Sequence, residues 1–469
     1  MYCSCSAAYA DAEPNTHVCP ICLGLPGALP VINEAAIETV IRTGLALDCT
    51  IPPRCKLDRK NYVYPDLPKG YQISQYDMPL CVDGALVYDV EGQPRRAGIT
   101  RVHIEEDTGR LLHPESAVGT TVSLIDLNRS GVPLMEIVGD PDLRSPEEAR
   151  EYLIALRQIL RYIGASNGNM EEGAFRCDAN ISTRALDGST VGPKVEIKNM
   201  NSFRAVERAL RYEEQRQRAA LDTGESLVQE TRGWVEGKDI TVAQRTKEQA
   251  HDYRYFPEPD LPPLTITQEI VHDVTATLPE LPMPRRIRVQ RDYGLSAPDA
   301  AQLTQERGIA DIFEEAVDGQ GSEHARAVAT WMLNDVMGLA RVRGLAADEL
   351  PVSATQLTDL VVSIQRQTLT ARAAKEVLPQ LGEGELPSEA AARLNLLSMD
   401  DQDAVRSAAM ESIRANQAAV ADYKNGKSAA IGRLIGETMK RTSGRARPDV
   451  VRTVLVALLE SEDSLIPPT

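Results

Sequence analysis

Four cysteines near the start of the chain have the spacing of a metal site. Cys3 and Cys5 form one close pair, and Cys19 and Cys22 form a second. Two such pairs can place four thiolates around a tetrahedral Zn²⁺, and four protein ligands leave no open coordination position. The spacing therefore predicts a structural zinc site, with unrelated reduced thiols as the alternative. The remaining cysteines show no such pairing and are interpreted as core or incidental thiols: Cys49, Cys55, Cys81 and Cys177.

A second group of candidate residues is acidic and lies in or beside apolar, strand-like segments. It includes Glu105, Glu106, Glu136 and Asp178, although an unpaired charge among apolar neighbours is costly. Strand alternation can direct such side chains to one face, and clustered oxygen ligands suit Mg²⁺ bound together with substrate phosphates. For any single carboxylate, a salt bridge or a solvated face is the alternative. Further polar residues belong to the group: Glu172, Arg176, Asn180, Glu196 and Lys198.

A phosphate-binding loop of the usual kind is not indicated. Gly426-Lys427-Ser428 matches the end of such a motif, but Ala421 stands where the motif requires glycine, and the segment is predicted to be helical. Any nucleotide must therefore be held by another kind of pocket.

The stretch 424–452 is strongly basic within a chain whose formal net charge is −17. An apolar stripe at helical spacing leaves its cations on the solvent side of a helix. Concentrated positive charge can hold a phosphate backbone, whereas a merely solvated charged face is the alternative. The basic residues are Lys424, Lys427, Arg433, Lys440, Arg441, Arg445, Arg447 and Arg452.

Two segments rich in tyrosine and proline, 60–71 and 252–262, are typical of neither helix nor strand. Rigid loops that carry amphipathic aromatic rings commonly line pockets. Packing around the core is the alternative for both.

Composition excludes several classes of protein. The 469 residues, 42% hydrophobic and 25% charged, are typical of a globular protein with a sizeable core. No apolar run approaches the ~18 residues that span a bilayer, and the start resembles no secretory signal, so we expect a cytoplasmic protein without membrane contact. The acidic net charge argues against a protein that coats nucleic acid over its whole surface.

The elements that position these residues are predicted to mix sheet and helix. Segments 85–90 and 97–104 alternate as strands, and strand signals return at 179–183 and 194–198. A helix is predicted from Ser145 to Ile163, with Ser145 as cap, Pro146 at the first turn and Glu148 completing a capping box. A second helix is predicted over about 203–221, ending near Gly224. The fold class is therefore α+β.

Near residues 281–284 the sequence becomes uniformly helical in character, and a turn-rich break follows at 382–387. We therefore predict three domains: a mixed sheet and helix domain over 1–290, an all-α helical domain over 291–385, and a small helical tail domain over 386–469.

Six strings of the sequence carry a family resemblance: 11–16, 22–27, 60–71, 126–129, 169–173 and 252–262. They resemble the B subunit of the aspartyl/glutamyl-tRNA(Asn/Gln) amidotransferase family, and the likeness covers nearly the whole chain. No insertion like the extra domain of the archaeal relative is evident, so the heterotrimeric type is favoured.

The resemblance implies a cradle-shaped catalytic domain, a helical domain and a tail that contacts tRNA. It implies ATP-dependent phosphorylation of the side-chain carboxylate of glutamate or aspartate misacylated on tRNA(Gln) or tRNA(Asn), after which ammonia displaces phosphate. It also implies two partners in a heterotrimer, an amidase-type glutaminase (the A subunit) that supplies the ammonia and a small third protein (the C subunit).

The resemblance further implies individual roles. Glu106, Glu136 and Asp178 would hold Mg²⁺, and Lys60 would lie on the ammonia path. Bound metal and cations would lower the repulsion between anions that acyl phosphate formation brings together. Residues expected to face the nucleotide are Glu105, Glu172, Arg176, Asn180 and Lys198; those expected to bind tRNA are Lys424, Lys427, Arg433, Lys440, Arg441, Arg445 and Arg447.

Members of the family usually begin earlier, with a strand that carries Gly-Leu-Glu-x-His and contributes to the metal site. This strand is absent from the sequence. We therefore expect either a start codon further upstream or a chain impaired in phosphorylation. The alternative function is a non-catalytic, zinc-stabilised scaffold that binds tRNA.

Overall fold

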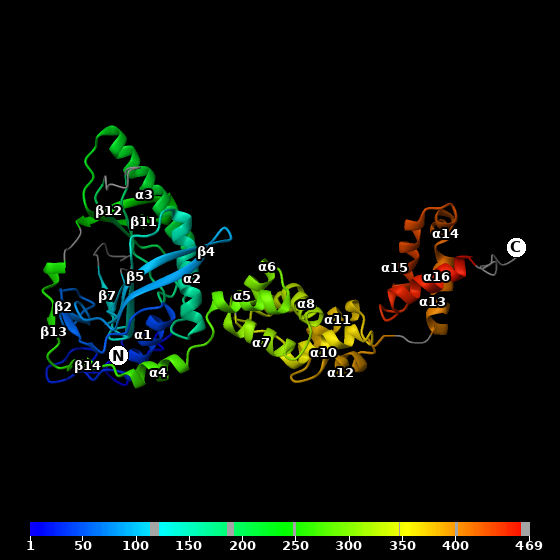
Figure 1. Cartoon of the computed structure of the whole chain (residues 1–469), viewed down its shortest axis with the longest axis horizontal. Helices are drawn as coiled ribbons and strands as arrows, with labels where there is room; N and C mark the ends of the chain where they lie inside the picture. The colour runs from blue at the N-terminus through cyan, green and yellow to red at the C-terminus, as the bar shows by residue number, and fades with distance from the viewer. Residues whose placement is uncertain (113–121, 185–191, 247–249, 347, 399–401, 461–469) are drawn as a thin grey trace. The chain divides into compact units, whose positions relative to one another are not determined.

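A computed structural model describes residues 1–112, 122–184, 192–246, 250–346, 348–398 and 402–460. The chain divides into two compact units, Met1–Met283 and Pro284–Thr469 (Figure 1). Within the described residues every strand belongs to the first unit, whereas the second unit is helical. The predicted α+β class is confirmed.

A three-stranded antiparallel sheet occupies the middle of the first unit, in the order β4 (Cys81–Val90), β5 (Gln93–Glu106) and β8 (Pro133–Gly139). β4 and β5 form a hairpin whose turn residues Glu91 and Gly92 both have positive φ, as a tight two-residue turn requires. β5 pairs on its other side with β8, so its polar residues face those of β8 across the ladder.

Other strands bring distant segments together. β2 (Asp58–Asn61) lies between β3 (Tyr71–Ser74) and β13 (Phe256–Pro257), which joins the two tyrosine-rich segments in one small sheet. A four-stranded sheet has the order β12-β11-β10-β9, with β10 and β11 parallel and the other pairs antiparallel. Its strands are β9 (Ala179–Ile181), β10 (Val195–Lys198), β11 (Glu230–Val235) and β12 (Ile240–Thr246); the remaining pairs are β1 (Arg54–Cys55) with β14 (Leu264–Thr265) and β6 (Arg110–Leu112) with β7 (Leu124–Asp126).

Both long helices predicted for this unit are confirmed as α2 (Pro146–Tyr162) and α3 (Phe203–Thr223). Ser145 caps α2 by accepting from the backbone N–H of Glu148 at 3.1 Å, and Gly224 ends α3 in the left-handed conformation. The predicted capping box is incomplete. The Glu148 carboxylate instead accepts from the Arg144 backbone N–H at 2.7 Å and from the Tyr88 hydroxyl at 2.9 Å.

One hydrophobic core underlies the first unit. α1 (Glu34–Ala46), β4, β5, α2 and α3 all contribute to it, and Val102 and Ile104 of β5 are fully buried in it. Since successive side chains of a strand point to opposite faces, the alternate residues His103 and Glu105 lie on the other face. The two helices α4 (Gln268–Ala276) and α1 are in contact at the edge of this core.

The second unit has two separate hydrophobic clusters, one over residues 289–391 and one over 405–459. We predicted the first domain boundary at residue 290, and this residue lies inside α5. The division of the chain into three domains stays a prediction. The helices are α5 (Pro282–Tyr293), α6 (Ala297–Leu303), α7 (Arg307–Val317), α8 (Ser322–Trp331), α9 (Met337–Arg343), α10 (Ala354–Gln365), α11 (Ala371–Val377), α12 (Pro387–Arg393), α13 (Gln402–Ala415), α14 (Gln417–Lys424), α15 (Ile431–Arg441) and α16 (Pro448–Glu460).

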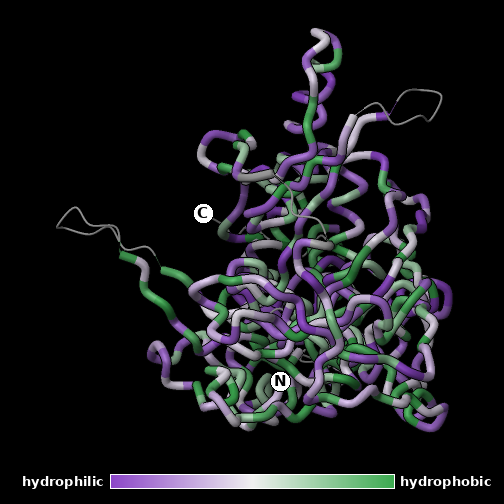
Figure 2. The backbone as a smooth tube through the Cα atoms, turned by 90° about the vertical axis from the view of Figure 1, so that its left-hand side faces the viewer, coloured by the Kyte–Doolittle hydropathy of each residue, from purple (hydrophilic) through white to green (hydrophobic). Residues whose placement is uncertain are grey.

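Hydrophobic and hydrophilic residues are interspersed along the backbone (Figure 2). In the described residues, no helix has the length and apolar character that crossing a membrane requires.

Candidate functional site

Strand pairing brings three potential metal ligands together. His103 of β5 lies directly opposite Glu136 of β8, and Glu105 follows His103 by two residues on the same face. His103 Nε2 is 3.3 Å from Glu105 Oε1 and 3.8 Å from Glu136 Oε2, and one ligand atom from each residue lies within 4.8 Å of the others. We call these three residues the strand triad. They fit a divalent cation that keeps positions open for substrate oxygens.

The two carboxylates of the strand triad differ in exposure. Glu105 is buried, whereas the Glu136 side chain is 49% exposed and can reach a ligand in solution. Ser74 Oγ donates to Glu105 Oε1 at 2.7 Å, and Gln72 Nε2 donates to Glu105 Oε2 at 3.2 Å. These bonds hold the buried carboxylate in place, while Glu136 completes the site from the solvent side.

Electrostatics keep Glu105 ionised. Burial raises the pKa of Glu105, but the hydrogen bond from His103 and the positive charge of Lys60 outweigh burial and lower this pKa to about 2. Arg101 Nε lies 3.4 Å from His103 Nδ1, which places a second cation beside the strand triad. A carboxylate that is anionic at neutral pH next to two cations suits a metal together with phosphate oxygens.

Lys60 lies on β2 opposite Gln72 of β3. Its ammonium group is 4.9 Å from the ring centroid of Tyr253 and 5.9 Å from that of Tyr62. Gln72 also donates to Glu105, so the sheet that joins the two tyrosine-rich segments places Lys60 near Glu105.

Glu106 points away from the strand triad. The period of two along β5 puts it on the face opposite His103 and Glu105, where both of its oxygens accept from Lys69 Nζ, Oε2 at 2.6 Å. Its Oε1 also accepts from the Ile73 backbone N–H at 2.8 Å, and burial raises the pKa of Glu106. Sequence reasoning assigned Glu106 to a shared magnesium site with Glu136 and Asp178, and the structure does not bring these three together.

Asp178 lies just before β9, in the four-stranded sheet. Its side chain is 50% exposed and accepts from Lys198 Nζ of β10 at 2.7 Å. Asn180 is paired with Glu196 across β9 and β10, and Glu196 accepts from Thr231 Oγ1 at 2.8 Å. These polar residues form a second cluster, separate in the sequence and the sheet from the strand triad.

Two other predicted residues, Arg176 and Glu172, have polar partners in the first unit. Arg176 Nη2 donates to Asp107 Oδ2 at 2.7 Å, and Asp107 comes directly after β5. Glu172 Oε2 accepts from Asn167 Nδ2 at 3.2 Å and lines a pocket of about 520 Å³. Residues 7–12 and His17, which lie between the two cysteine pairs in the sequence, also line this pocket.

The four predicted zinc ligands converge. Cys22 Sγ lies 3.4 Å from Cys3 Sγ, 3.6 Å from Cys19 Sγ and 3.8 Å from Cys5 Sγ. Burial raises the pKa of Cys19, but backbone N–H groups of Cys22 and Ile21 outweigh it and lower this pKa to about 7. The donor set of four sulfurs from two short turns fits tetrahedral Zn²⁺.

The basic stretch forms α15 and its flanks. Several of its cations have acidic or polar partners: Lys427 pairs with Asp422, Arg441 with Glu411 and Glu437, Arg445 with Asn395 and Arg447 with Asp449. Lys424, Arg433 and Lys440 are exposed and make no ion pair with any described residue. These three side chains are therefore available to a ligand.

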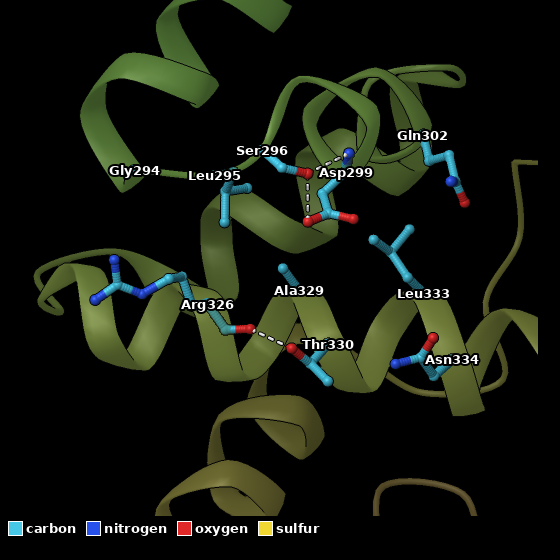
Figure 3. A pocket seen from close by; sticks show the side chains of 10 residues that line it. All are labelled: Gly294, Leu295, Ser296, Asp299, Gln302, Arg326, Ala329, Thr330, Leu333 and Asn334. Carbon is cyan, nitrogen blue, oxygen red and sulfur yellow. Dashed lines mark hydrogen bonds between the residues drawn. The ribbon is translucent and has the colours of Figure 1, made fainter.

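A further pocket of about 360 Å³ lies in the second unit between the start of α6 and the helix formed by α8 and its π-helical continuation (Figure 3). Ser296, Asp299 and Gln302 line one side, and Arg326, Thr330 and Asn334 line the other. None of the predicted site residues belongs to it.

His103 is the candidate ligand that sequence reasoning missed. The signal was present, since a histidine and a glutamate two residues apart in a strand share a face. Its cross-strand partner depends on the register between β5 and β8, which the sequence alone does not show.

Comparisons with known proteins cover almost the whole chain. Residues 1–272 match the family described as the GatB/GatE catalytic domain, and residues 311–459 match the family described as the GatB domain.

Three curated relatives, each named as the B subunit of an aspartyl/glutamyl-tRNA(Asn/Gln) amidotransferase, illustrate the similarity. The protein of Thermomicrobium roseum is 56% identical over 98% of this chain and 95% of its own length. The protein of Dehalococcoides mccartyi strain CBDB1 is 49% identical over 98% of this chain and 95% of its own length. The protein of Carboxydothermus hydrogenoformans is 47% identical over 97% of this chain and 94% of its own length.

Proposed function

Because the chain belongs to the family of aspartyl/glutamyl-tRNA(Asn/Gln) amidotransferase B subunits, we propose that it carries the kinase and transamidation site of a tRNA-dependent ligase. Its substrates are glutamate misacylated on tRNA(Gln), aspartate misacylated on tRNA(Asn), or both. ATP activates the side-chain carboxylate, and ammonia from a partner protein displaces phosphate.

The strand triad is the proposed centre of this activity. Glu105, Glu136 and His103 would hold Mg²⁺, which would supply neutralisation of the charge on the phosphate and carboxylate oxygens. Lys60 and Arg101 supply positive charge near these anions. A carboxylate is a poor electrophile, so lowering the repulsion between it and the γ-phosphate is what the site must do.

The remaining predicted residues have supporting roles in this proposal. Glu106 positions Lys69 and β3 behind the strand triad, through its contacts with the Lys69 ammonium group and the Ile73 N–H. Asp178 and Lys198, with Asn180 nearby, present a half-exposed polar surface to the bound nucleotide or aminoacyl end. Arg176 and Glu172 extend this surface, and Lys60 also guides ammonia.

The other parts of the chain serve structure and tRNA binding. Cys3, Cys5, Cys19 and Cys22 hold a structural Zn²⁺. The cradle-shaped catalytic domain spans 1–290, the helical domain 291–385 and the tail domain 386–469, whose basic helix α15 and flanks contact the tRNA phosphates. The partners are the amidase-type glutaminase (the A subunit) and the small third protein (the C subunit) of a heterotrimer, and the enzyme works in the cytoplasm.

The observation that carries the proposal is the convergence of His103, Glu105 and Glu136 beside Lys60 and Arg101. The test uses the chain assembled with its two partners, Glu-tRNA(Gln) and Asp-tRNA(Asn), and labelled ATP. We expect Mg²⁺-dependent transfer of the γ-phosphoryl group to the aminoacyl carboxylate even without glutamine. Normal tRNA affinity with no phosphoryl transfer would instead identify a non-catalytic scaffold.

A further inference from the structure

Two tyrosine rings from distant segments are stacked beside the strand triad. Tyr76 follows β3 and Tyr255 precedes β13, and their ring centroids are 4.5 Å apart with an interplanar angle of 11°. The residue Tyr76 is 48% exposed, so its side of the stack is open to solvent. The other close aromatic pairs of this region have edge-to-face geometry, including Tyr253 with Tyr255 at 6.1 Å.

The backbone holds both rings in place. The Tyr76 N–H donates to Asp58 Oδ2 at 3.0 Å, and Asp58 is buried and paired with Lys56. On the other side, Asn61 Nδ2 donates to the carbonyl of Arg254 at 2.8 Å, and Phe256 pairs with Arg59 in the ladder. The stack is thus preorganised, because both segments are attached to β2.

The stack lies next to the proposed metal site. Ser74, two residues before Tyr76, donates to Glu105, and Gln75 accepts from the Ile104 N–H at 3.2 Å. Burial raises the pKa of Tyr255, and the negative charges of Glu105 and Glu136 raise it further. The segment that carries Tyr76 is thus attached to Glu105 through Ser74, so a flat ligand on the stack would lie on the same side of β3 as this contact and near the strand triad.

We propose that Tyr76 and Tyr255 form a stacking platform for an adenine ring beside the strand triad. An open tyrosine face that is held flat by a second ring gains from stacking with a base, and every base offers a π-face. The inference rests on the proposed function, which supplies two adenine-bearing substrates. These are ATP and the aminoacyl-tRNA, whose terminal adenosine carries the amino acid.

The experiment compares three variants of the assembled enzyme with the wild type. Tyr76→Leu removes the ring, Tyr76→Phe keeps it, and Tyr64→Leu is the matched control because Tyr64 is 49% exposed and contacts Tyr62 instead of the stack. We measure the equilibrium binding of ATP and of two RNA hairpins, one ending in CCA and one ending in CC. We also measure the KM values of ATP and aminoacyl-tRNA.

We expect Tyr76→Leu to weaken binding of one adenine-bearing substrate about tenfold with little change in kcat, and Tyr76→Phe to behave as the wild type. Weaker ATP binding assigns the platform to the nucleotide. Weaker binding of the CCA hairpin, with that of the CC hairpin unchanged, assigns it to the terminal adenosine.

Unchanged binding of both substrates in Tyr76→Leu would overturn the platform. Loss of the partner proteins from Tyr76→Leu in gel filtration, with both binding constants unchanged, would show instead that the stack is a docking face. If the wild-type enzyme forms no phosphorylated aminoacyl-tRNA, the proposed function fails, yet the binding measurements still decide about the platform.

Discussion

Glu136 of β8 lies directly across the ladder from His103 of β5, with 3.8 Å between Glu136 Oε2 and His103 Nε2. Because of this cross-strand pair, the carboxylates of Glu105 and Glu136, which are far apart in the sequence, both lie beside the His103 imidazole. Glu136 is the exposed member, so it can be changed without disturbing the core.

Glu136→Gln should keep the fold and reduce phosphoryl transfer at least a hundredfold, because one anionic ligand of the strand triad is lost. Initial rates with labelled ATP, together with the circular dichroism spectrum, check both parts. Glu91→Gln, an exposed change in the β4–β5 turn of the same sheet, is the control. A near-normal rate for Glu136→Gln would remove this residue from the site.

Glu105 makes stability depend on acid pH. Its pKa is lowered in the folded protein to about 2 from an ordinary 4.5, so the ionised group stabilises the fold above pH 4.5, and this contribution disappears as the pH falls toward 2. We expect the wild type to exceed Glu105→Gln in free energy of unfolding by about 2 kcal/mol at pH 6. Urea unfolding at several pH values should show this gap closing between pH 4.5 and pH 2, and a constant gap would contradict the assignment.

Glu106→Gln should act mainly on stability, because it leaves the Lys69 ammonium group buried without an anionic partner. Removing one partner of a buried pair costs about 3–5 kcal/mol. The double variant with Lys69→Met should regain part of this loss, which thermal unfolding would reveal. A normal melting temperature for Glu106→Gln with lost phosphoryl transfer would instead return Glu106 to the predicted metal site.

Asp178→Asn tests the second polar cluster. The side chain is half exposed, so we expect normal folding, together with a greatly reduced rate of phosphoryl transfer if Asp178 faces the reacting groups. Single-turnover assays measure the rate, and Asp239→Asn, an exposed residue after β11, serves as control. An unchanged rate would confine Asp178 to its ion pair with Lys198.

Cys19→Ser should lower zinc content and thermal stability together, since metal binding contributes directly to folding. Metal analysis of the purified protein and its melting temperature are the measurements. Cys177→Ser, a cysteine outside the cluster, should keep its zinc. The same zinc content in Cys19→Ser and wild type would reject the four-cysteine site.

The triple variant Lys424→Gln, Arg433→Gln, Lys440→Gln should weaken tRNA binding and lower the slope of log affinity against log salt by up to about three, one for each phosphate contact. The matched control replaces Lys427, Arg441 and Arg447, which have acidic partners, and should change the slope less. Equal slopes for wild type and both variants would exclude this surface from tRNA binding.

Local patterns were enough to predict the two long helices, the main strands, the four-cysteine cluster and the α+β class. Ser145 begins α2 and Gly224 ends α3 through contacts within a few residues, and two short cysteine pairs can converge through short loops. Such features depend on neighbours in the sequence, which the sequence displays directly.

The choice of candidate metal ligands depended on tertiary structure. Glu105 and Glu106 are adjacent and chemically alike, so the sequence favours neither, but β5 buries one beside His103 and the other against Lys69. The register between β5 and β8 then places Glu136 beside His103. The pairing of β2 with β13 brings Lys60 close to Tyr253, and it also brings Tyr255 onto Tyr76. Composition and local spacing thus determined which chemistry was possible, whereas strand register, a relation between distant residues, decided which side chains meet.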